Sequence, residues 1–253
     1  MAPVIAFPYH DPDGRLFVHM QAILPVLKIH FERVHICLSP NTQRQAGITA
    51  WLSADDFFTI LPLERELPAG EHFAYLYTHV AQVEQPETIV HLCYPDRVAF
   101  ALQGEYRSQF LADIDSISPE TLPLIFQRSA RAWQTHPQNY ARLEGFVTQV
   151  GQNLFGRALD YGWCHMVLTA GLLRQVMPKV THPGISMVAE MVLHMQHYIR
   201  TQEVDWLAWE DPFIQGRDTA ELKRERENSL EETEKRLAYV LAMVDALTRF
   251  ARK

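Results

Sequence analysis

Short apolar runs alternate with helix-length segments through the first hundred residues, and this alternation constrains the fold more than any other feature. The runs are rich in β-branched and aromatic residues and are bounded by turn formers; they lie at residues 4–7, 33–38, 57–61 and 88–93. Between them, residues 16–31 and 70–83 carry apolar side chains at helical spacing. Such alternation implies a largely parallel sheet with helices on its faces. We therefore predict an α/β fold with 4–7, 33–38 and 88–93 as neighbouring central strands.

The strand pattern weakens after residue 104. Residues 119–155 predict two helices divided at His136–Pro137, because proline ends a helix before it. The remaining segments predict, in chain order, a strand at 163–168, a short helix at 169–177, a longer helix at 184–201 and a final strand at 204–209.

The last segment differs in kind from the rest of the chain. Asp218 and Glu221 form a helix-capping pattern, and leucines then recur at helical spacing up to Leu247. A helix of about 30 residues spans roughly 45 Å, and its highly charged first half cannot be buried on all sides. The segment predicts either a solvated helix whose last turns dock on the protein or a helix that forms a homodimer. We therefore divide the chain into a domain at 1–217 and a charged amphipathic helix at 218–253.

Composition restricts the functional classes. Of 253 residues, 47% are hydrophobic and 21% are charged, which is ordinary for a globular protein. The formal charge of −7 gives no electrostatic footprint for nucleic acid, and no apolar run approaches the roughly 20 residues of a membrane span. The N-terminus lacks the basic segment of a signal peptide. The three cysteines, Cys37, Cys93 and Cys164, show no metal-ligand spacing and are typical of a reducing compartment, so we expect a cytoplasmic protein.

Several common catalytic motifs are absent from the sequence. It contains no Gly-x-x-x-x-Gly-Lys loop, no Gly-x-Gly-x-x-Gly after the first strand, no His-Glu-x-x-His and no Gly-x-Ser-x-Gly. These absences disfavour phosphate-loop nucleotidases, dinucleotide-binding enzymes, zinc peptidases and serine hydrolases that use these motifs.

The turn after the first predicted strand groups side chains suited to a nucleotide. Proline lacks the N–H that a strand donates to its neighbour, so we expect the chain to turn out at the carboxyl end of the strand, where open α/β sheets place ligands. An aromatic ring, a carboxylate and a cation suit a base, a ribose and a phosphate. The candidates for nucleotide binding are Pro8, Tyr9, His10, Asp11 and Arg15, with Ser39 at the end of the next strand. The alternative is a polar loop in which Asp13 caps the following helix.

A polar break, Tyr94-Pro95-Asp96-Arg97, divides the apolar run at 88–93 from another at 98–102, and the two runs predict two strands. Asp96 offers the oxygen ligands that Mg²⁺ and Mn²⁺ prefer. Arg97 can pair with a phosphate through two hydrogen bonds. The alternative is a β-turn with an Asp–Arg pair on the surface.

This segment resembles the Asp-x-Asp-Arg motif of glycosyltransferases with the nucleotide-diphospho-sugar (GT-A) fold, with Tyr94 in the place of the first acid. Later segments follow in the order found in a group of bacterial glycosyltransferase-like proteins: 125–133 with Arg128, then His136–Pro137, Glu144, Asn153 and Asp160. The resemblance covers roughly residues 3–215. It implies a GT-A-like fold with a mostly parallel central sheet flanked by helices.

The resemblance also implies roles for individual residues. Glu190 matches the carboxylate that inverting members use as general base on the acceptor hydroxyl; the alternative is an exposed helix residue. Asp96, with Glu210 or Asp211 in the place of a C-terminal histidine ligand, would hold Mn²⁺ or Mg²⁺. Trp163 and His165 either face the sugar or belong to a buried strand.

The leading hypothesis is a glycosyltransferase that transfers a sugar from a nucleotide-diphospho-sugar to an acceptor that the sequence does not identify. The alternative is a non-catalytic nucleotide-sugar-binding or scaffold protein on the same fold, which Tyr94 favours. A third hypothesis is an interaction protein that acts through its charged tail.

Overall fold

A seven-stranded, mostly parallel sheet forms the centre of the protein. The computed structural model describes residues 2–162, 165–181 and 184–252. The strands are β1 (Val4–Tyr9), β2 (Val34–Leu38), β3 (Phe58–Pro62), β4 (Ile89–Leu92), β5 (Leu124–Arg128), β6 (Met166–Thr169) and β7 (Arg200–Val204), in the order β3-β2-β1-β4-β6-β5-β7. β1 pairs in parallel with β2 and β4, which confirms the predicted central neighbours. β6 runs antiparallel to both β4 and β5.

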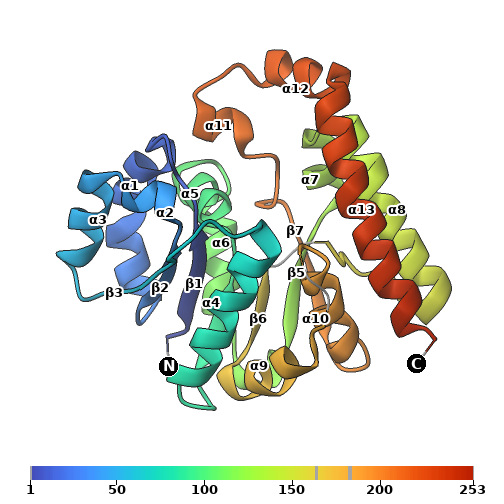
Figure 1. The fold of residues 1–253 in the computed structure, drawn as a ribbon, viewed down its shortest axis with the longest axis horizontal. Coiled ribbons are helices and arrows are strands. Elements are labelled where there is room, and N and C mark those ends of the chain that lie inside the picture. Colours follow the sequence, from blue (N-terminus) through green and yellow to red (C-terminus); the bar gives the residue numbers. More distant parts are fainter. Residues whose placement is uncertain (1, 163–164, 182–183, 253) are drawn as a thin grey trace.

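Helices cover both faces of this sheet (Figure 1). They are α1 (Arg15–His30), α2 (Pro40–Gln43), α3 (Ala46–Ser53), α4 (Ala69–Val83), α5 (Pro95–Gln103), α6 (Arg107–Asp115), α7 (Ala130–Thr135), α8 (Gln138–Phe155), α9 (Ala170–Val176), α10 (Met187–Met195), α11 (Asp211–Gln215), α12 (Thr219–Asn228) and α13 (Leu230–Phe250), with short 3-10 turns η1 (Pro119–Thr121) and η2 (Met177–Lys179). In the part of the chain that the structure describes, no helix has both the length and the apolar character needed to cross a membrane.

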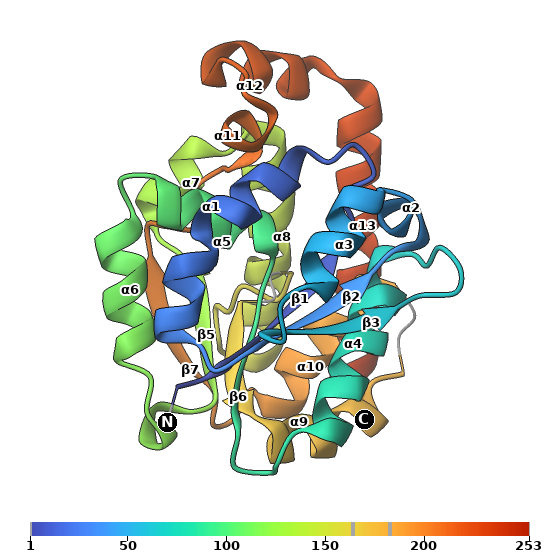
Figure 2. The ribbon, with the colours of Figure 1, turned by 90° about the vertical axis from the view of Figure 1, so that its left-hand side faces the viewer.

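Helices pack on both faces of the sheet (Figure 2), and each face has its own hydrophobic core. On one face, Val4 and Leu92 pack with apolar residues of α4, α9, α10 and α13. On the other, Ile5 and Phe7 pack with apolar residues of α1, α5 and α6. Successive side chains of a strand point to opposite faces, so neighbours in β1 enter different cores. All of β1 is buried, as expected for a central parallel strand.

The segment after β4 is a helix, so the prediction of a second strand at 98–102 is wrong. α5 begins at Pro95, and its buried residues include Val98 and Leu102. Proline is favoured at the first helical position, and the negative charge of Asp96 is favourable in the first turn. A short apolar run fits a buried helix face as well as it fits a strand, which explains the error.

Other differences concern the second half of the chain. The boundary at His136–Pro137 separates α7 from α8 as predicted, but β5 precedes them and was not predicted. The final strand is β7, which ends at Val204, so the prediction of a strand at 204–209 is wrong beyond its first residue. Of the strand predicted at 163–168, the structure describes β6 from Met166 onward, and Trp163 and Cys164 lie outside the described residues.

The C-terminal tail contains the expected long helix, but it is divided. Asp218 caps α12 by accepting a hydrogen bond from the N–H of Glu221, as the sequence predicted. Ser229 interrupts the helix with extended backbone, and its side chain caps α13 at the N–H of Glu232. α13 lies side by side with α8 (Figure 1).

Two glycines of α8 offer a matched test of its packing. A Cβ at Gly151 would lie 2.0 Å from Cε2 of the buried Tyr161 ring, whereas a Cβ at Gly145 would meet nothing within 4 Å. Gly151→Ala is therefore expected to lower the free energy of unfolding by about 1–3 kcal/mol through overpacking. Gly145→Ala should raise it by up to about 1 kcal/mol through helix propensity. Urea denaturation measures both, and equal stabilities of the two variants would contradict the packing described here.

Candidate functional site

A crevice opens where β1 and β4 end at the carboxyl edge of the sheet. It consists of two adjoining cavities of about 260 and about 360 Å³, whose linings share Ala69, Phe73, Tyr94 and Asp96. Asp96 reaches this place because β4 ends at Leu92 and α5 begins at Pro95. Open α/β sheets bind ligands at this edge, and pockets for small molecules commonly have volumes of roughly 300–1,000 Å³. We call the larger cavity the β1 cavity and the smaller one the α13 cavity.

The β1 cavity joins the loops that follow β1, β3 and β4. Its lining includes Pro8, His10, Glu66 and His72. Nδ1 of His10 lies 2.8 Å from the hydroxyl of Ser39, so the ends of β1 and β2 meet at this edge as predicted. Nε2 of His72 lies 2.8 Å from the carbonyl oxygen of Cys37 in β2, which orients the ring. Burial lowers the pKa of His72, so the neutral ring donates this bond.

Tyr9 and Asp11 are buried and hold the loop in place instead of lining the crevice. The Tyr9 hydroxyl donates to Oδ2 of Asp11 over 3.4 Å, and the same oxygen accepts from the N–H of Phe17 at 2.9 Å. Asp11 therefore stabilises the start of α1. The alternative in which Asp13 caps this helix is wrong, because Gly14 occupies the N-cap position and the bond to the first turn comes from Asp11. Arg15 lies on the surface, 3.8 Å from Asp13, and contributes to neither cavity lining.

Three carboxylates converge on the α13 cavity. Asp96 lies in the first turn of α5, Glu210 precedes α11 and Asp211 begins it, and all three line the cavity. Burial raises the pKa of Asp96; Arg97 opposes this shift, and the charge of Asp211 adds to it. Burial also raises the pKa of Glu210 well above its usual range, again against Arg97. Carboxylates that disfavour ionisation in this way gain from a bound cation, and their oxygens suit Mn²⁺ or Mg²⁺.

Arg97 is buried behind these carboxylates, with only 2% of the residue exposed. Its Nη1 donates to the carbonyl oxygens of Leu207, at 3.0 Å, and Ala208, and Nη2 lies 2.7 Å from Oε2 of Glu210. These contacts hold the loop between β7 and α11 against α5. Both terminal nitrogens of Arg97 bind the protein and hold Glu210 in place, so Arg97 is not part of a surface pair. Its contact with a phosphate stays a prediction.

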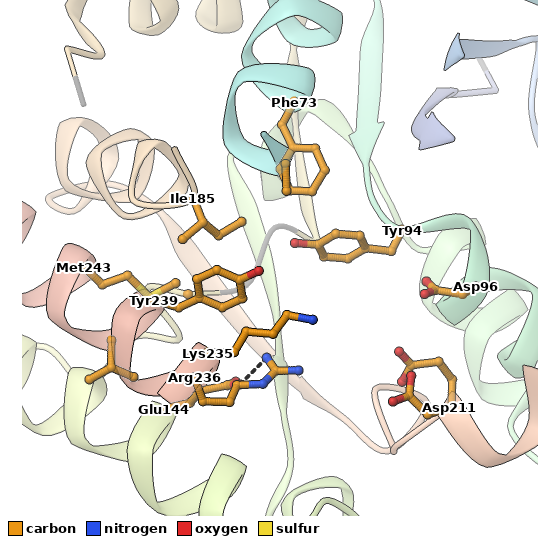
Figure 3. Close-up of a pocket in the computed structure, with 14 residues that line it drawn as sticks. Phe73, Tyr94, Asp96, Glu144, Ile185, Asp211, Lys235, Arg236, Tyr239 and Met243 are labelled. Atoms are coloured by element: carbon orange, nitrogen blue, oxygen red, sulfur yellow. Dashed lines mark hydrogen bonds and ion pairs between the residues drawn. The ribbon is translucent and has the colours of Figure 1, made fainter. Parts of the chain in front are cut away.

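The opposite wall of the α13 cavity comes from the C-terminal helix and carries basic and aromatic side chains. α13 contributes Lys235, Arg236, Tyr239 and Met243 to the lining. Figure 3 shows Lys235 extending from α13 toward the side of the cavity that carries Asp96 and Asp211. Sequence reasoning missed this wall because nothing local in the tail indicates that it returns to the sheet edge. The apolar positions at the end of the tail were the one available signal.

A buried charged network fixes α8 and α13 around the cavity. Nε and Nη2 of Arg128 each donate to Asp160 at 2.9 Å, and Nη1 donates to Glu144 at 2.7 Å. Glu144 also accepts from Arg236 at 2.8 Å, and the Arg128 guanidinium stacks 3.5 Å from the ring centre of Trp133. Burial alone would raise the pKa of Glu144, but the arginines lower it. Residues that the resemblance placed in order along the chain are thus brought together in space.

Glu190 and His165 lie away from the crevice lining. Glu190 is 3% exposed and accepts hydrogen bonds from the N–H and the hydroxyl of Thr181 at 2.7 and 3.0 Å, so it is not an exposed helix residue. To act as a general base, Glu190 would have to release its hydrogen bonds from Thr181. The role of Glu190 as base stays a prediction. His165 is fully buried with Trp206 in the core, as in the alternative of a buried strand. Trp163, the other candidate for sugar contact, lies outside the described residues.

Comparison with known proteins identifies the fold. No protein-family model and no curated protein matches the sequence. A solved structure of a mycobacterial protein is 12% identical, with a TM-score of 0.57 over 99% of this chain and 75% of that chain. Glucosyl-3-phosphoglycerate synthase from Mycobacterium tuberculosis, solved with Mn²⁺, UDP and phosphoglyceric acid, is 11% identical, with a TM-score of 0.52 over 96% of this chain and 78% of that chain. The same enzyme, solved with UDP-glucose in place of UDP, is 11% identical, with a TM-score of 0.51 over 96% of this chain and 80% of that chain. The chain therefore has a fold like that of GT-A glycosyltransferases.

Proposed function

We propose that the protein is a glycosyltransferase that binds a nucleotide-diphospho-sugar in the crevice and transfers the sugar to an acceptor. One observation carries the proposal: Asp96, Glu210 and Asp211 converge at the carboxyl edge of a sheet with a GT-A-like fold. The two cavities share Tyr94 and Asp96. A ligand can therefore extend from one to the other, with the nucleoside in the β1 cavity and the sugar in the α13 cavity.

The β1 cavity offers groups suited to a nucleoside. Pro8 and Phe73 provide apolar surface for a base, and His10 and Glu66 provide hydrogen-bonding groups for the ribose hydroxyls. The diphosphate would then lie beside Asp96, at the junction of the cavities. This arrangement leaves the α13 wall, with Lys235 and Tyr239, as the surface that the acceptor meets.

The carboxylates fit a divalent cation in the crevice. Asp96, Glu210 and Asp211 would hold Mn²⁺ or Mg²⁺, because these ions prefer oxygen ligands. When bound, such an ion offsets the negative charge that develops on the diphosphate leaving group. Tyr94 supplies no carboxylate where GT-A enzymes have their first acid, so we expect weak binding of the metal alone and measurable binding with a nucleotide diphosphate. The neighbouring enzyme was solved with both Mn²⁺ and UDP.

A non-catalytic nucleotide-sugar-binding protein is the second candidate, and Tyr94 is the observation that favours it. Loss of one anionic ligand weakens the metal site that an enzyme needs, while the crevice still accommodates a nucleotide. Turnover separates the two candidates: the enzyme releases the nucleotide diphosphate, whereas the binding protein returns the intact donor. Glu190→Gln should reduce turnover without changing donor affinity if Glu190 is the base.

Thermal-shift measurements with UDP-, GDP- and ADP-sugars, each with and without Mn²⁺, test the proposed donor class. We expect one nucleotide class to raise the melting temperature, and to raise it more with Mn²⁺, because a ligand stabilises the folded state that binds it. Mass spectrometry of the same mixtures then detects release of the nucleotide diphosphate. The absence of a shift with every donor would overturn the proposal.

The raised pKa values of Asp96 and Glu210 predict a pH-dependent metal affinity. Both carboxyls keep their protons to a higher pH than ordinary carboxyls, so Mn²⁺ must displace protons and its affinity should rise as the pH rises. Without metal, the same shifts mean that stability falls as the pH rises from the ordinary carboxyl pKa through the raised value. Calorimetric titration of Mn²⁺ in two buffers of different ionisation enthalpy counts the released protons. The Asp96→Asn variant should release fewer protons than the wild type when it binds Mn²⁺. Equal proton release from the variant and the wild type would contradict the assignment of Asp96 as a metal ligand.

A homodimer through the C-terminal helix stays a prediction, as does a cytoplasmic location. Leu237 and Leu241 of α13 are 43% and 59% exposed, which leaves an apolar stripe on the outer face of the helix. Light scattering should detect a dimer that Leu241→Glu dissociates, and a monomeric wild-type protein would contradict it. The division into 1–217 and 218–253 also stays a prediction; α13 packs on α8 and α10 and lines the crevice.

A further inference from the structure

Two histidines and a cysteine meet on one face of the sheet, outside the crevice. His91 lies in β4, Cys93 directly follows β4, and His165 directly precedes β6. β4 and β6 are antiparallel, with Leu92 opposite Met166. Continuing this register places Cys93 opposite His165, and strand alternation puts the side chains of His91, Cys93 and His165 on the same face. The pairing of β4 with β6 therefore creates a cluster that no spacing in the sequence reveals.

The donor atoms of this cluster are close together and buried. One ligand atom from each residue lies within 4.8 Å of the others, and all three residues are 0% exposed. Neither ring nitrogen of His91, and neither of His165, has a hydrogen-bond partner in the described part of the chain. A buried polar atom without a partner is costly, and four such atoms in two adjacent rings point to a bound ligand. A tetrahedral Zn²⁺ would need its ligand atoms about 3.3–3.8 Å apart, so binding would draw the three side chains closer together.

Aromatic side chains pack against the cluster. The ring centroids of His91 and Phe126 lie 5.8 Å apart, and those of His165 and Trp206 lie 5.3 Å apart. The ring of Tyr94 lies 5.7 Å from that of His165 and also lines the crevice. Tyr94, which stands where the Asp-x-Asp-Arg motif has its first acid, thus packs against the cluster of His91, Cys93 and His165.

We propose that His91, Cys93 and His165 form a second metal site, for a thiophilic cation such as Zn²⁺ or Cu⁺. Imidazole and thiolate donors select such ions, whereas the carboxylates of the crevice select Mn²⁺ or Mg²⁺, so the two sites differ in the ions that they take. On binding, the Cys93 thiol loses its proton to solvent, and one S–metal and two N–metal bonds form without any redox step. This site does not depend on the proposed glycosyl transfer.

Cobalt substitution tests the site in the full-length protein. The protein is stripped of metal with a chelator, kept reduced with a phosphine and titrated with Co²⁺ as a spectroscopic probe for Zn²⁺. We expect saturation at one equivalent with a thiolate-to-cobalt charge-transfer band. Zn²⁺ or Cu⁺ added afterwards should bleach this band, whereas Mn²⁺ should leave it unchanged, and the more effective competitor identifies the preferred ion.

Matched variants assign the band to individual residues. Cys93→Ser and His165→Phe should abolish it, while Cys37→Ser and Cys164→Ser should retain it. His165→Phe keeps an aromatic ring in an aromatic environment, and circular dichroism confirms that each variant is folded. Asp96→Asn should retain the band, which separates this site from the proposed crevice metal. A wild-type protein without the band, or a band that survives Cys93→Ser, overturns the proposal.

Discussion

Asp96→Asn is expected to abolish the Mn²⁺-dependent part of nucleotide-diphosphate binding. Asp96 lies on the wall shared by both cavities, and Glu210 and Asp211 line one of them, so in the proposed complex its carboxylate would lie beside both the ion and the diphosphate. The amide preserves the shape of the side chain but removes the charge. Partners that merely support metal ligands contribute roughly 10–100-fold to affinity, so loss of a ligand should cost more than ~100-fold. Calorimetric titration of UDP, with and without Mn²⁺, measures the coupling.

Asp13→Asn is the matched control for this experiment. Asp13 is exposed, forms an ion pair with Arg15 and lines neither cavity in the described part of the chain, so the substitution should leave the coupling unchanged. If Asp96→Asn keeps the full effect of Mn²⁺, the ion is bound elsewhere and the assignment of the crevice carboxylates fails.

Arg128→Met is expected to lower the free energy of unfolding by about 3–5 kcal/mol, because it leaves buried carboxylates without their partner. The side chain of Arg128 is 0% exposed and binds both Asp160 and Glu144. Methionine fills part of the volume, so the effect reports mainly the uncompensated charges. Arg236 still reaches Glu144, but Asp160 loses its two hydrogen bonds from Arg128. Guanidinium chloride denaturation measures the change in the free energy of unfolding. The slope of this free energy against denaturant concentration is compared with that of the wild type.

Arg131→Met provides the comparison, three residues along the chain. The Arg131 side chain is 60% exposed and pairs with Glu105 and Asp205 at 3.6 and 3.4 Å. Exposed pairs contribute about 0–1 kcal/mol, so this variant should be close to the wild type. Similar losses of unfolding free energy in Arg128→Met and Arg131→Met would show that the buried network stabilises the protein no more than an exposed ion pair does.

The parallel half of the sheet was predictable because its information is local. β1, β2 and β4 are continuous apolar runs bounded by turn formers, and helices of clear periodicity separate them. Local information failed where a short run fits two structures. All of residues 98–102 except Phe100 are buried in α5, and β5 offers only three consecutive apolar residues, Leu124–Phe126, before polar ones begin.

The site was predictable only in part, for a different reason. Residues next to strand ends, such as His10 and Asp96, reach the crevice because the topology of a parallel sheet brings strand ends together. Leu207 and Ala208, whose carbonyl oxygens accept from Arg97, lie 110 and 111 residues away, and no local pattern indicates them. The same holds for Lys235, which lines the crevice only because α13 packs on α8 and α10. The His91–Cys93–His165 cluster depends on the pairing of β4 with β6, and that pairing joins segments distant in the sequence.

A crystal structure of the protein with Mn²⁺ and the nucleotide selected by thermal shift tests directly whether the crevice binds a nucleotide through its carboxylates. We expect an anomalous manganese peak among Asp96, Glu210 and Asp211, with the diphosphate beside it and the nucleoside in the β1 cavity next to His10. Nucleotide bound outside the crevice, or a crevice that stays empty at saturating nucleotide and Mn²⁺, would contradict it.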